Sequence, residues 1–399
     1  MGLNGSDIVI VAAARTAIGS FQGDFSSLTA PDLGAVAIRA VLQRTGLDAS
    51  HVDEVLMGNV LSAGIGQAPA RQAALGAGIG EFTPCTTISK VCGSGMKAVM
   101  FAFDQIRAES CEIAVAGGME SMTSAPYLLE KARAGLRIGH SDVKDHMFLD
   151  GLEDAYTGRS MGEFAQETAD KNNITREAMD AFAIESLARA NQATDKGHFG
   201  AEIAPVTLKG KKEPVVVRVD QQPGAAKPEK IPHLRPAFAS KGTITAANSS
   251  SISDGAAALL VMSAAKAKEL GLDPMARIVA HTTHAQHPGS FTTAPIVSMR
   301  KLMDKAQWNV EDVDLFEINE AFAMVTMMAM EALALAHDKV NVNGGACALG
   351  HPLGASGARI LVTLVHALKQ REKTRGVASL CLGGGEATSI AVEMLGSKT

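Results

Sequence analysis

The chain has 399 residues and carries 37 Lys and Arg against 42 Asp and Glu, so its formal net charge of −5 excludes a global positive field that would recruit nucleic acid. Hydrophobic residues make up 46% of the chain, enough for a large buried core, and the length predicts roughly two or three domain-sized units. There is no uninterrupted apolar run of about 18 residues, so we expect no membrane-spanning helix.

The compartment is predicted from the amino terminus and from cysteine usage. The first residues, MGLNGSDIVIVAAARTAIG, lack the basic start and long apolar core of a secretory signal. The absence of a C-x-x-C pair argues against a disulfide framework and a zinc site. We therefore expect a reducing, cytoplasmic location. The cysteines are odd in number and scattered: Cys85, Cys92, Cys111, Cys347 and Cys381.

The first 120 residues alternate short apolar strands with helical patterns. Strand-like DIVIVAAA (7–14) precedes helix-like APDLGAVAIRAVLQRTG (30–46), and VDEVLMGNV (52–60) is the next strand. A helix then starts after Cys92, and EIAVAGG (112–118) forms another strand. This order is typical of βαβ units around a parallel sheet that is covered on both faces.

The segment 121–246 differs in character and separates the first series from the rest. It begins rich in Met, Ser and Gly, and Thr175 is a plausible N-cap for a helix that ends near Gly197. A stretch rich in Lys, Pro and Gln follows at 209–232. Insertions of this length usually carry ligand-binding loops, so we predict a loop or lid domain.

A second α/β series near the end repeats the first in the same order. Ala294-Pro295 opens a helix as Ala30-Pro31 does, and each helix leads to a Val-Asp strand that ends at an Asn. NVNGGA (341–346) is the next strand-like piece, and ASGARILV from 355 matches GSGMKAVM from 93. We interpret this as an internal duplication, although any two α/β halves look somewhat alike. The predicted units are 1–120 with 247–270, the loop domain 121–246, and 271–399.

Four reactive side chains fall at predicted strand ends, where ligands gather in open α/β sheets. They are Cys92, Asn319, His351 and Cys381, and a duplication axis would bring them together. A cysteine at a helix N-terminus gains thiolate character, yet a free cysteine is also a common buried apolar residue. Cys85 and Cys111 suit that structural reading, and Cys347 stays undecided.

The glycine-rich surroundings of His351 and Cys381 have two readings each. The loop GGACALGHPLGASGAR (344–359) holds His351 as a base for a thiol or as a satisfied turn residue. The three glycines after Cys381 expose N–H groups for an oxyanion hole, or simply make a close-packed turn. His281, His284 and His287 are followed by Pro288 and lack an interleaved carboxylate, so we favour a loop role and expect no metal.

An ordered set of motifs resembles the thiolase family, the biosynthetic acetyl-CoA acetyltransferases and the degradative 3-ketoacyl-CoA thiolases. The resemblance covers nearly the whole chain and implies two duplicated βαβαβαββ halves in an α/β/α/β/α core with an inserted loop domain. It also implies a homotetramer joined through residues 122–140. The motifs are VAAARTAIGSFQG (11–23), VCGSGMKAV (91–99), AGGMESMT (116–123), LRPAF (234–238), NEAFA (319–323), NVNGGACALGHPLGASGAR (341–359) and CLGGGEA (381–387).

The resemblance implies a role for each reactive position. Cys92 would take the acyl group from an acyl-CoA while His351 accepts its proton, and Cys381 would deprotonate the methyl group of a second acetyl-CoA. His351 and a water held by Asn319 would stabilise the enolate. The backbone N–H groups of Cys92 and Gly383 would form a second oxyanion hole.

The resemblance also implies a largely apolar pantetheine tunnel and an acyl pocket. Ser160 stands where relatives that prefer acetoacetyl-CoA carry a histidine, and no Arg lies near Pro223 at the adenine end. Lys227, Lys230 or Arg235 would serve the phosphates, unless they form a solvated basic face. The implied lining residues are Leu152, Ser160, Met161, Phe238, Ala246, Ser250, Phe291, Ala321 and Phe322.

The expected function is the reversible condensation of two acetyl-CoA to acetoacetyl-CoA and CoA, with the thioesters as substrates and no other cofactor. A degradative thiolase for longer 3-ketoacyl-CoA needs a wider pocket near Met161 and Phe291. A thiolase-fold protein that binds CoA esters without catalysis would lack a reactive residue. We expect no nucleic-acid or membrane partner.

Overall fold

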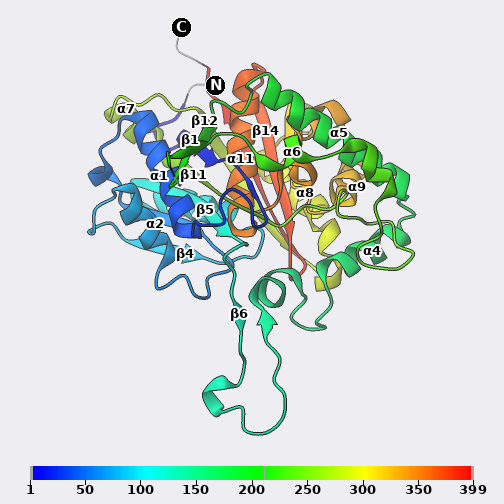
Figure 1. Ribbon diagram of the computed structural model, residues 1–399. Helices are drawn as coiled ribbons and strands as arrows, with labels where there is room; N and C mark the ends of the chain where they lie inside the picture. The colour runs from blue at the N-terminus through cyan, green and yellow to red at the C-terminus, as the bar shows by residue number, and fades with distance from the viewer. Residues whose placement is uncertain (1–2, 211, 397–399) are drawn as a thin grey trace.

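The computed structural model describes residues 3–210 and 212–396, and its centre is a mixed sheet with helices on both sides (Figure 1). In the first half the strands run in the order β4-β3-β5-β11-β1, with β3, β4 and β5 parallel and β11 antiparallel to its neighbours. Their bounds are β1 Ile8–Thr16, β3 Glu54–Gly58, β4 Cys85–Ile88, β5 Ile113–Ser121 and β11 Ser253–Ser263.

The second half repeats this strand order. β13 pairs in parallel with β14, β14 pairs with antiparallel β15, and β15 pairs with β12, so the order is β13-β14-β15-β12. The bounds are β12 Ala276–Ala285, β13 Leu315–Ile318, β14 Arg375–Leu382 and β15 Glu386–Met394. The two half-sheets meet along β1 and β12, through Val9 opposite Arg277 and Ile10 opposite Ala276. The predicted duplication is confirmed.

Two aspartates repeat one hydrogen-bond pattern in the two halves. Oδ2 of Asp53, just before β3, accepts the N–H groups of Glu112 and Ile113 at the start of β5, each at 2.9 Å. Oδ2 of Asp314, just before β13, accepts the N–H groups of Thr374 and Arg375 at the start of β14, also at 2.9 Å. The Val-Asp pair recognised in the sequence therefore fixes the register of the same two strands in each half.

The prediction of a full strand at 341–346 is wrong. Only Val340 pairs there, as an isolated parallel bridge to Phe316. The side chain of Asn341 replaces the backbone in the strand pairing. Its Oδ1 accepts the Ile318 N–H at 2.9 Å, and its Nδ2 donates to the Ile318 carbonyl at 2.8 Å. The carboxamide thus pairs as a peptide group would, and the following chain is free to form the loop that leads to His351.

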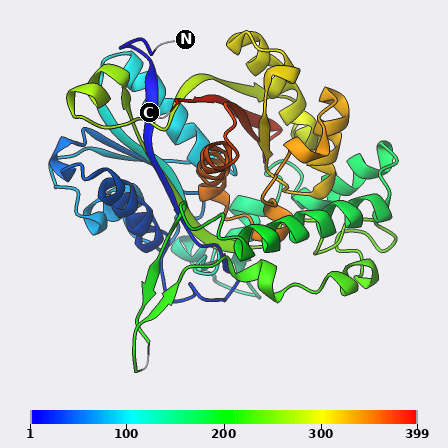
Figure 2. The same ribbon diagram turned by 90° about the horizontal axis from the view of Figure 1, so that it is seen from above.

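Helices form three layers with the two half-sheets between them, as seen from above in Figure 2. α1 and α2 cover the outer face of the first half, α8 and α9 cover the outer side of the second, and α3 and α11 lie in the middle. This is the predicted α/β/α/β/α core. The bounds are α1 Ala30–Thr45, α2 Pro69–Ala77, α3 Ser94–Arg107, α8 Ala294–Ala306, α9 Ala323–Leu333 and α11 Leu353–Gln370.

α1 shows why these segments fold as helices. The Thr29 hydroxyl accepts the Asp32 N–H while the Asp32 carboxylate accepts the Thr29 N–H, a capping box that satisfies the first turn. Gly46, with φ of 67°, ends the helix in the left-handed conformation that glycine adopts without strain. Its apolar face, including Leu33 and Ile38, is buried against β1, β5 and β11.

Glycines let α3 and α11 approach closely. A Cβ atom on Gly95 would lie 2.9 Å from the Gly354 carbonyl oxygen, and one on Gly357 would lie 2.5 Å from the Met96 nitrogen. Larger residues at these positions would force the two helices apart. Their N-terminal ends, which carry Cys92 and His351 in the preceding turns, are therefore held together.

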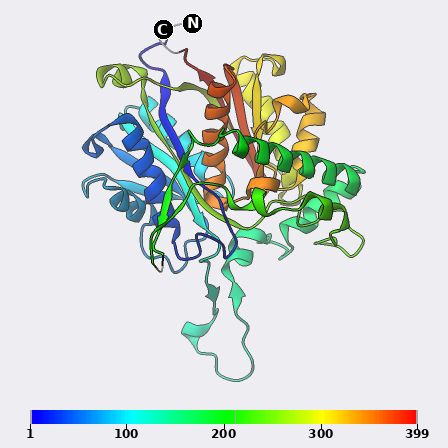
Figure 3. The ribbon, with the colours of Figure 1, turned by 45° about the horizontal axis from the view of Figure 1, so that its top comes forward.

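Residues 121–246 contain a ribbon that projects from the body and helices that lie over the second half (Figures 1 and 3). The Thr175 N-cap is confirmed, since its hydroxyl accepts the Ala178 N–H. The domain boundaries stay a prediction.

The helices and strands of this segment are β6 Tyr127–Leu128, β7 Lys144–Asp145, α4 Met161–Lys171, α5 Arg176–Asp195, β8 Ile203–Ala204, β9 Val206–Leu208, β10 Val215–Val217 and α6 Gln221–Ala225. Three short elements lie outside the segment: β2 Gly19–Ser20, α7 Ala264–Glu269 and α10 Ala346–Leu349.

A buried charge cluster ties this segment to the central sheet. Arg15 on β1 contacts Glu202 at 2.6 Å and Asp220 at 2.7 Å, and its side chain is wholly buried. Removing one partner would leave an uncompensated buried charge, which is strongly destabilising. Within residues 3–210 and 212–396, no helix is both long and apolar enough to cross a membrane.

Candidate active site

The four predicted reactive residues are all buried at the ends of core strands or the starts of core helices. Cys92 lies two residues before α3, His351 lies two residues before α11, and Asn319 directly follows β13. Cys381 is the penultimate residue of β14. The packing of α3 on α11 brings the elements that carry these residues into one region of the middle layer.

Cys92 lies in a strained turn between β4 and α3. Val91 has a φ of 46°, a conformation that is costly for a β-branched residue. Ser94 stabilises the turn, since its Oγ accepts the Lys90 N–H at 2.8 Å and donates to the Val91 carbonyl at 2.6 Å. The turn therefore fixes the direction of the Cys92 side chain before α3 begins.

The electrostatic surroundings keep Cys92 as a thiol at rest. Burial raises its pKa to about 12, and the negative charge of nearby Glu120 acts in the same direction. The backbone N–H groups of Gly383 and of Cys92 itself oppose this effect and lower the pKa, because they favour the charged form of the sulfur. These are the two groups predicted to form an oxyanion hole. The sulfur needs a base before it can attack a carbonyl.

His351 is held in one tautomer by Ser356. Ser356 Oγ donates to the Pro352 carbonyl at 2.8 Å, so it accepts from His351 Nδ1, which lies 2.6 Å away and carries the proton. The other ring nitrogen, Nε2, is buried and has no hydrogen-bond partner. Burial, helped by the charge of Arg359, lowers the pKa of His351 to about 3. His351 is thus a neutral imidazole with a free lone pair on Nε2.

Asn319 is oriented by a buried guanidinium. Arg359 Nη2 donates to Asn319 Oδ1 at 3.3 Å, and because a guanidinium only donates, this contact decides which side-chain atom is the oxygen. Asn319 Nδ2 then lies 3.5 Å from His351 Nδ1. Glu317, also buried, lies 3.8 Å from Arg359 Nη1. Ser356 and Arg359 stand three residues apart on one face of α11, so one helix orients both His351 and Asn319.

Cys381 is a buried thiol beside Cys92. Burial is the main cause that raises its pKa, and the neighbouring Cys92 sulfur raises it further. Cys381 belongs to an apolar cluster that collects most of the predicted lining residues. Phe291, Ala321 and Phe322 are buried in this cluster, and Met161 and Phe238 pack against it. The sulfur of Cys381 therefore faces apolar side chains and the second sulfur of the site.

The remaining predicted lining residues are distributed around this cluster. Leu152 ends a short π-helix, Phe148–Leu152, and packs with the middle-layer core that contains Cys92. The N–H and Oγ of Ser250 both donate to the Ala321 carbonyl, at 2.9 and 3.1 Å. Leu152 thus lies beside the core around Cys92 and Ser250 beside Ala321, and their contact with a substrate stays a prediction.

Ser160 has a structural task in addition to its predicted one. It is the N-cap of α4, where its hydroxyl accepts the Glu163 N–H and the Glu163 carboxylate accepts the Ser160 N–H. The Ser160 hydroxyl also lies 3.0 Å from Glu163 Oε2. With its hydroxyl engaged in a capping box, Ser160 has little hydrogen-bonding capacity left for a substrate.

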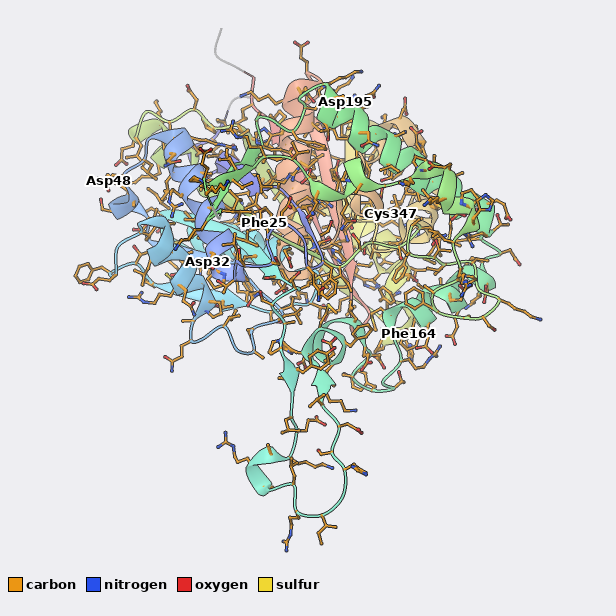
Figure 4. The ribbon with its side chains drawn as sticks, in the orientation of Figure 1. Phe25, Asp32, Asp48, Phe164, Asp195 and Cys347 are labelled. Atoms are coloured by element: carbon orange, nitrogen blue, oxygen red, sulfur yellow. The ribbon has the colours of Figure 1, made fainter. Side chains whose placement is uncertain are left out.

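A cavity of about 380 Å³ opens between α5, α6 and α10. Ala246 of the predicted tunnel lines it together with Cys347, which is labelled in Figure 4. Lys227 and Lys230 lie on the same lining, whereas Arg235 is exposed and does not line this cavity. Two of the three candidate phosphate-binding cations are therefore adjacent to the predicted tunnel.

The three spaced histidines do not form a metal centre. His281 Nε2 lies 3.0 Å from Asp104 Oδ1, and His284 Nε2 lies 3.2 Å from Gln286 Oε1. His287 caps a short turn by accepting the Gly289 N–H. Among the described residues, no group of three or more His, Cys, Asp and Glu is placed to hold a metal ion.

Sequence reasoning missed the residues that orient the site. Ser356 and Arg359 stand inside the GASGAR motif. Their helical spacing after His351 is the sequence feature that could have identified them as residues that orient the site. Glu120, inside AGGMES, is buried and accepts the N–H groups of Val60, Leu61 and Gly354 at 2.8 to 3.1 Å. It ties β3 and β5 to the first turn of α11, which follows His351.

Family models match almost the whole chain. The thiolase N-terminal domain matches residues 8–265, and the thiolase C-terminal domain matches residues 272–394. The chain belongs to the thiolase family. Curated relatives named acetyl-CoA acetyltransferase agree with this assignment. One from Pseudomonas aeruginosa is 48% identical over 97% of this chain and 99% of its own length, and one from Cupriavidus necator is 48% identical over the same shares.

Solved structures of thiolases share the fold of this chain. A Bacillus anthracis acetyl-CoA acetyltransferase superposes with a TM-score of 0.95 at 40% identity, covering 98% of this chain and 99% of its own. A thiolase from Ascaris suum in complex with coenzyme A gives a TM-score of 0.92 at 41% identity, covering 98% of this chain and 100% of its own. The predicted thiolase fold is therefore confirmed.

Proposed function

We propose that this thiolase catalyses the reversible condensation of two acetyl-CoA into acetoacetyl-CoA and CoA. The observation that carries the proposal is the paired environment of Cys92 and His351. Two backbone N–H groups favour the charged form of the Cys92 sulfur, and His351 presents an unpartnered buried Nε2 in the neutral state. This is the donor and acceptor set that acyl transfer through a thioester requires.

The first half-reaction transfers an acetyl group to Cys92. The Cys92 proton moves to His351 Nε2 as the sulfur attacks the carbonyl carbon of acetyl-CoA, and the N–H groups of Cys92 and Gly383 hold the oxyanion. When the tetrahedral intermediate collapses, the C–S bond to CoA breaks. The departing CoA thiolate takes the proton of Cys381, because the raised pKa of that buried thiol keeps it protonated at rest. An acetyl-cysteine, an imidazolium and a Cys381 thiolate remain.

The second half-reaction forms the carbon–carbon bond. The Cys381 thiolate removes a proton from the methyl group of a second acetyl-CoA, and the enolate oxygen is stabilised by His351 Nε2–H and by a water held by Asn319. The enolate carbon attacks the acetyl group, the bond to the Cys92 sulfur breaks, and Cys92 regains its proton from His351. Every thiol is restored, so the same steps run in reverse when CoA is abundant.

The cavity beside Ala246 supports a coenzyme A site. A CoA thioester carries several phosphates, and Lys227 and Lys230 supply cations on that cavity, whereas the stretch DQQPGAA around Pro223 contains no Arg. The relative from Ascaris suum was solved in complex with coenzyme A. CoA thioesters serve as substrates in this proposal, and no metal or further cofactor takes part.

Packing around the predicted acyl pocket favours a short acyl group over the longer 3-ketoacyl chains of degradative thiolases. The Phe322 ring lies between those of Phe238 and Phe291, with centroid separations of 6.1 and 6.4 Å. A Cβ on Gly162, beside Met161, would lie 2.3 Å from the Phe238 ring. Thiolytic kcat/KM across 3-ketoacyl-CoA chain lengths tests this choice, and a maximum at a long chain would select the degradative alternative.

The decisive experiment separates acylation from proton abstraction. Brief exposure of the wild type to acetoacetyl-CoA should leave an acetyl adduct on the Cys92 peptide in mass spectrometry. With acetyl-CoA as the donor, Cys381→Ala should still form this adduct, because the departing CoA thiolate can take a proton from the solvent, but it should fail to exchange deuterium from the solvent into acetyl-CoA. An adduct of equal yield on Cys92→Ser contradicts the nucleophile, and retained exchange in Cys381→Ala contradicts the base. A chain that binds CoA esters without either reaction would be the non-catalytic alternative.

We also propose a cytoplasmic homotetramer. All five cysteines are free thiols, which fits a reducing compartment. The ribbon around β6 and β7 projects from the body (Figure 3). It exposes apolar side chains, among them those of Tyr127 and Ile138. Such a surface suits contact with another copy.

A further inference from the structure

Two turns from different halves of the chain pack directly on each other at the Cys92 sulfur. A Cβ on Gly93 would lie 2.7 Å from Leu382 Cδ2, and a Cβ on Gly383 would lie 3.4 Å from a Val91 methyl carbon. The first turn supplies the Cys92 N–H and the second supplies the Gly383 N–H. The spacing of these two donors therefore depends on how one turn is placed against the other.

Ser94 fixes the first turn internally, and the Gly385 carbonyl in the second turn accepts the Gln286 N–H, but neither contact sets the placement of one turn against the other. Val91 holds an unfavourable φ of 46°, and a residue of this kind persists only where its surroundings over-determine it. Gly384 and Gly385 both have a φ of 84°, in a region that glycine enters and leaves at little cost. A contact that spans both turns would hold them in register.

Lys90 and Glu386 supply such a contact. Lys90 immediately precedes strained Val91, and Glu386 immediately follows the three glycines, at the start of β15. Their charged groups form an ion pair across the two turns, with side-chain exposures of 20% and 30%. The pair thus lies at the outer end of both donor-bearing turns, one residue before Val91 and one residue after Gly385.

We propose that Lys90 and Glu386 are positioning residues that set the separation of the Cys92 and Gly383 N–H groups. The inference rests on the proposed function, in which these groups hold the oxyanion. Because the pair is partly exposed, it contributes little to global stability. Its effect is on the geometry of the hole, where a displacement of about 1 Å is enough to slow a reaction by up to two orders of magnitude.

A double-mutant cycle tests the pair in the full-length enzyme. We expect Glu386→Gln and Lys90→Met each to lower kcat for acetoacetyl-CoA thiolysis about tenfold with KM unchanged, and the double variant to lose no more than either single. The reversed pair, Lys90→Glu with Glu386→Lys, should recover most of the loss. Lys97 also interacts electrostatically with both residues. Glu386→Gln is therefore the clearer test, because it removes the carboxylate that both lysines face.

A matched control removes an ion pair far from the site. Lys266 contacts Glu112 at 3.0 Å on the surface, and Lys266→Met and Glu112→Gln should leave kcat unchanged. Thermal unfolding of all variants should agree with the wild type within a few degrees. A large loss of stability in Glu386→Gln would overturn the positioning role in favour of a merely structural one.

A second readout does not depend on turnover. The rate at which iodoacetamide alkylates Cys92 at neutral pH, followed by peptide mass spectrometry, should be lower in Glu386→Gln than in the wild type. The reason is that a displaced Gly383 N–H no longer stabilises the Cys92 thiolate. Wild-type kcat and an unchanged alkylation rate in both single variants would overturn the inference. An inactive wild type would instead contradict the proposed function, and the alkylation rates would still decide the role of the pair.

Discussion

At the residue scale, the site depends on side chains that never meet a substrate. The hydroxyl of Ser356 decides which nitrogen of His351 carries the proton, since it donates to Pro352 and must accept from Nδ1. Arg359 decides which way the Asn319 amide points. The chemistry of Cys92 is therefore set by two polar residues on the first turns of α11.

Replacing Ser356 tests the tautomer argument. In Ser356→Ala the Nδ1–H of His351 loses its acceptor, and the proton can move to Nε2, where it blocks the base. We expect kcat to fall by about 10²-fold, within the range of a general base contribution, while KM changes little. Steady-state kinetics and the rate of adduct formation on Cys92 measure this. Ser356→Thr keeps the hydroxyl and should retain most activity, and equal losses in the two variants would contradict the argument.

The buried neutral histidine predicts a dependence of stability on pH. His351 has a pKa of about 3 in the folded chain, below the ordinary value near 6.5, because burial disfavours the charged form. Above pH 6.5 it is neutral in both states. As the pH falls below 6.5 the unfolded chain binds a proton that the folded chain does not, so the free energy of unfolding decreases by about 1.4 kcal/mol per pH unit, down to the folded pKa.

Urea unfolding between pH 6 and 5 measures this slope. His351→Gln should flatten it by about 1.4 kcal/mol per pH unit. His281 and His366 contribute in the same direction, because burial also lowers their pKa values. The control His140→Gln changes an exposed residue and should leave the slope as it is. An unchanged slope in His351→Gln would show that the imidazole is already charged or exposed in the folded protein.

At the element scale, much of the fold was predictable because hydrophobic periodicity and Val-Asp strand starts repeat in both halves. Position 341 shows where such reasoning fails. A strand pattern cannot reveal that the carboxamide of Asn341 pairs with Ile318 in place of the backbone. Likewise, Cys92 and His351 were found because glycine-rich turns flank them, whereas the contact between Arg359 and Asn319 joins two separate elements and leaves no local signal.

The packing of α3 on α11 predicts the effect of one methyl group. In an exposed helix, Gly→Ala is stabilising by roughly 0.5–1 kcal/mol. Gly357→Ala should instead destabilise the protein by about 1–3 kcal/mol, because its Cβ meets the Met96 backbone and the helices must separate. Thermal and urea unfolding measure the sign. Gly224→Ala on α6 is the matched control, since its Cβ meets nothing within 4 Å, and a stabilised Gly357→Ala would disprove the close contact.

At the scale of the whole molecule, the projecting ribbon is the part of the chain least explained by the monomer. Ile138 is 99% exposed and Tyr127 is 67% exposed, an arrangement that is unfavourable in water without a partner. The ribbon's two strands pair only with each other. The rest of the chain does not bury these side chains. The prediction of a tetramer therefore depends on their contact with another copy.

Sedimentation measures this prediction. The wild type should sediment as a tetramer, and replacing residues 127–145 with a short Gly-Ser linker should yield a smaller, still active species. Replacing the shorter loop at the tip of the β9–β10 hairpin is the control and should not change the assembly. A wild type that sediments as a stable monomer would contradict the role of the ribbon.

The repeat of one strand order in two halves has a consequence for how such a site can arise. Two identical halves related by an axis would present the same residue at both equivalent strand ends. This reaction needs different partners there, one to carry an acyl group and one to move a proton. Fusion of the halves into a single chain lets the two positions vary separately: the turn before α3 carries Cys92, and the equivalent turn before α11 carries His351. The broken symmetry is what allows one turn to hold the acyl carrier and the other to hold the group that takes its proton.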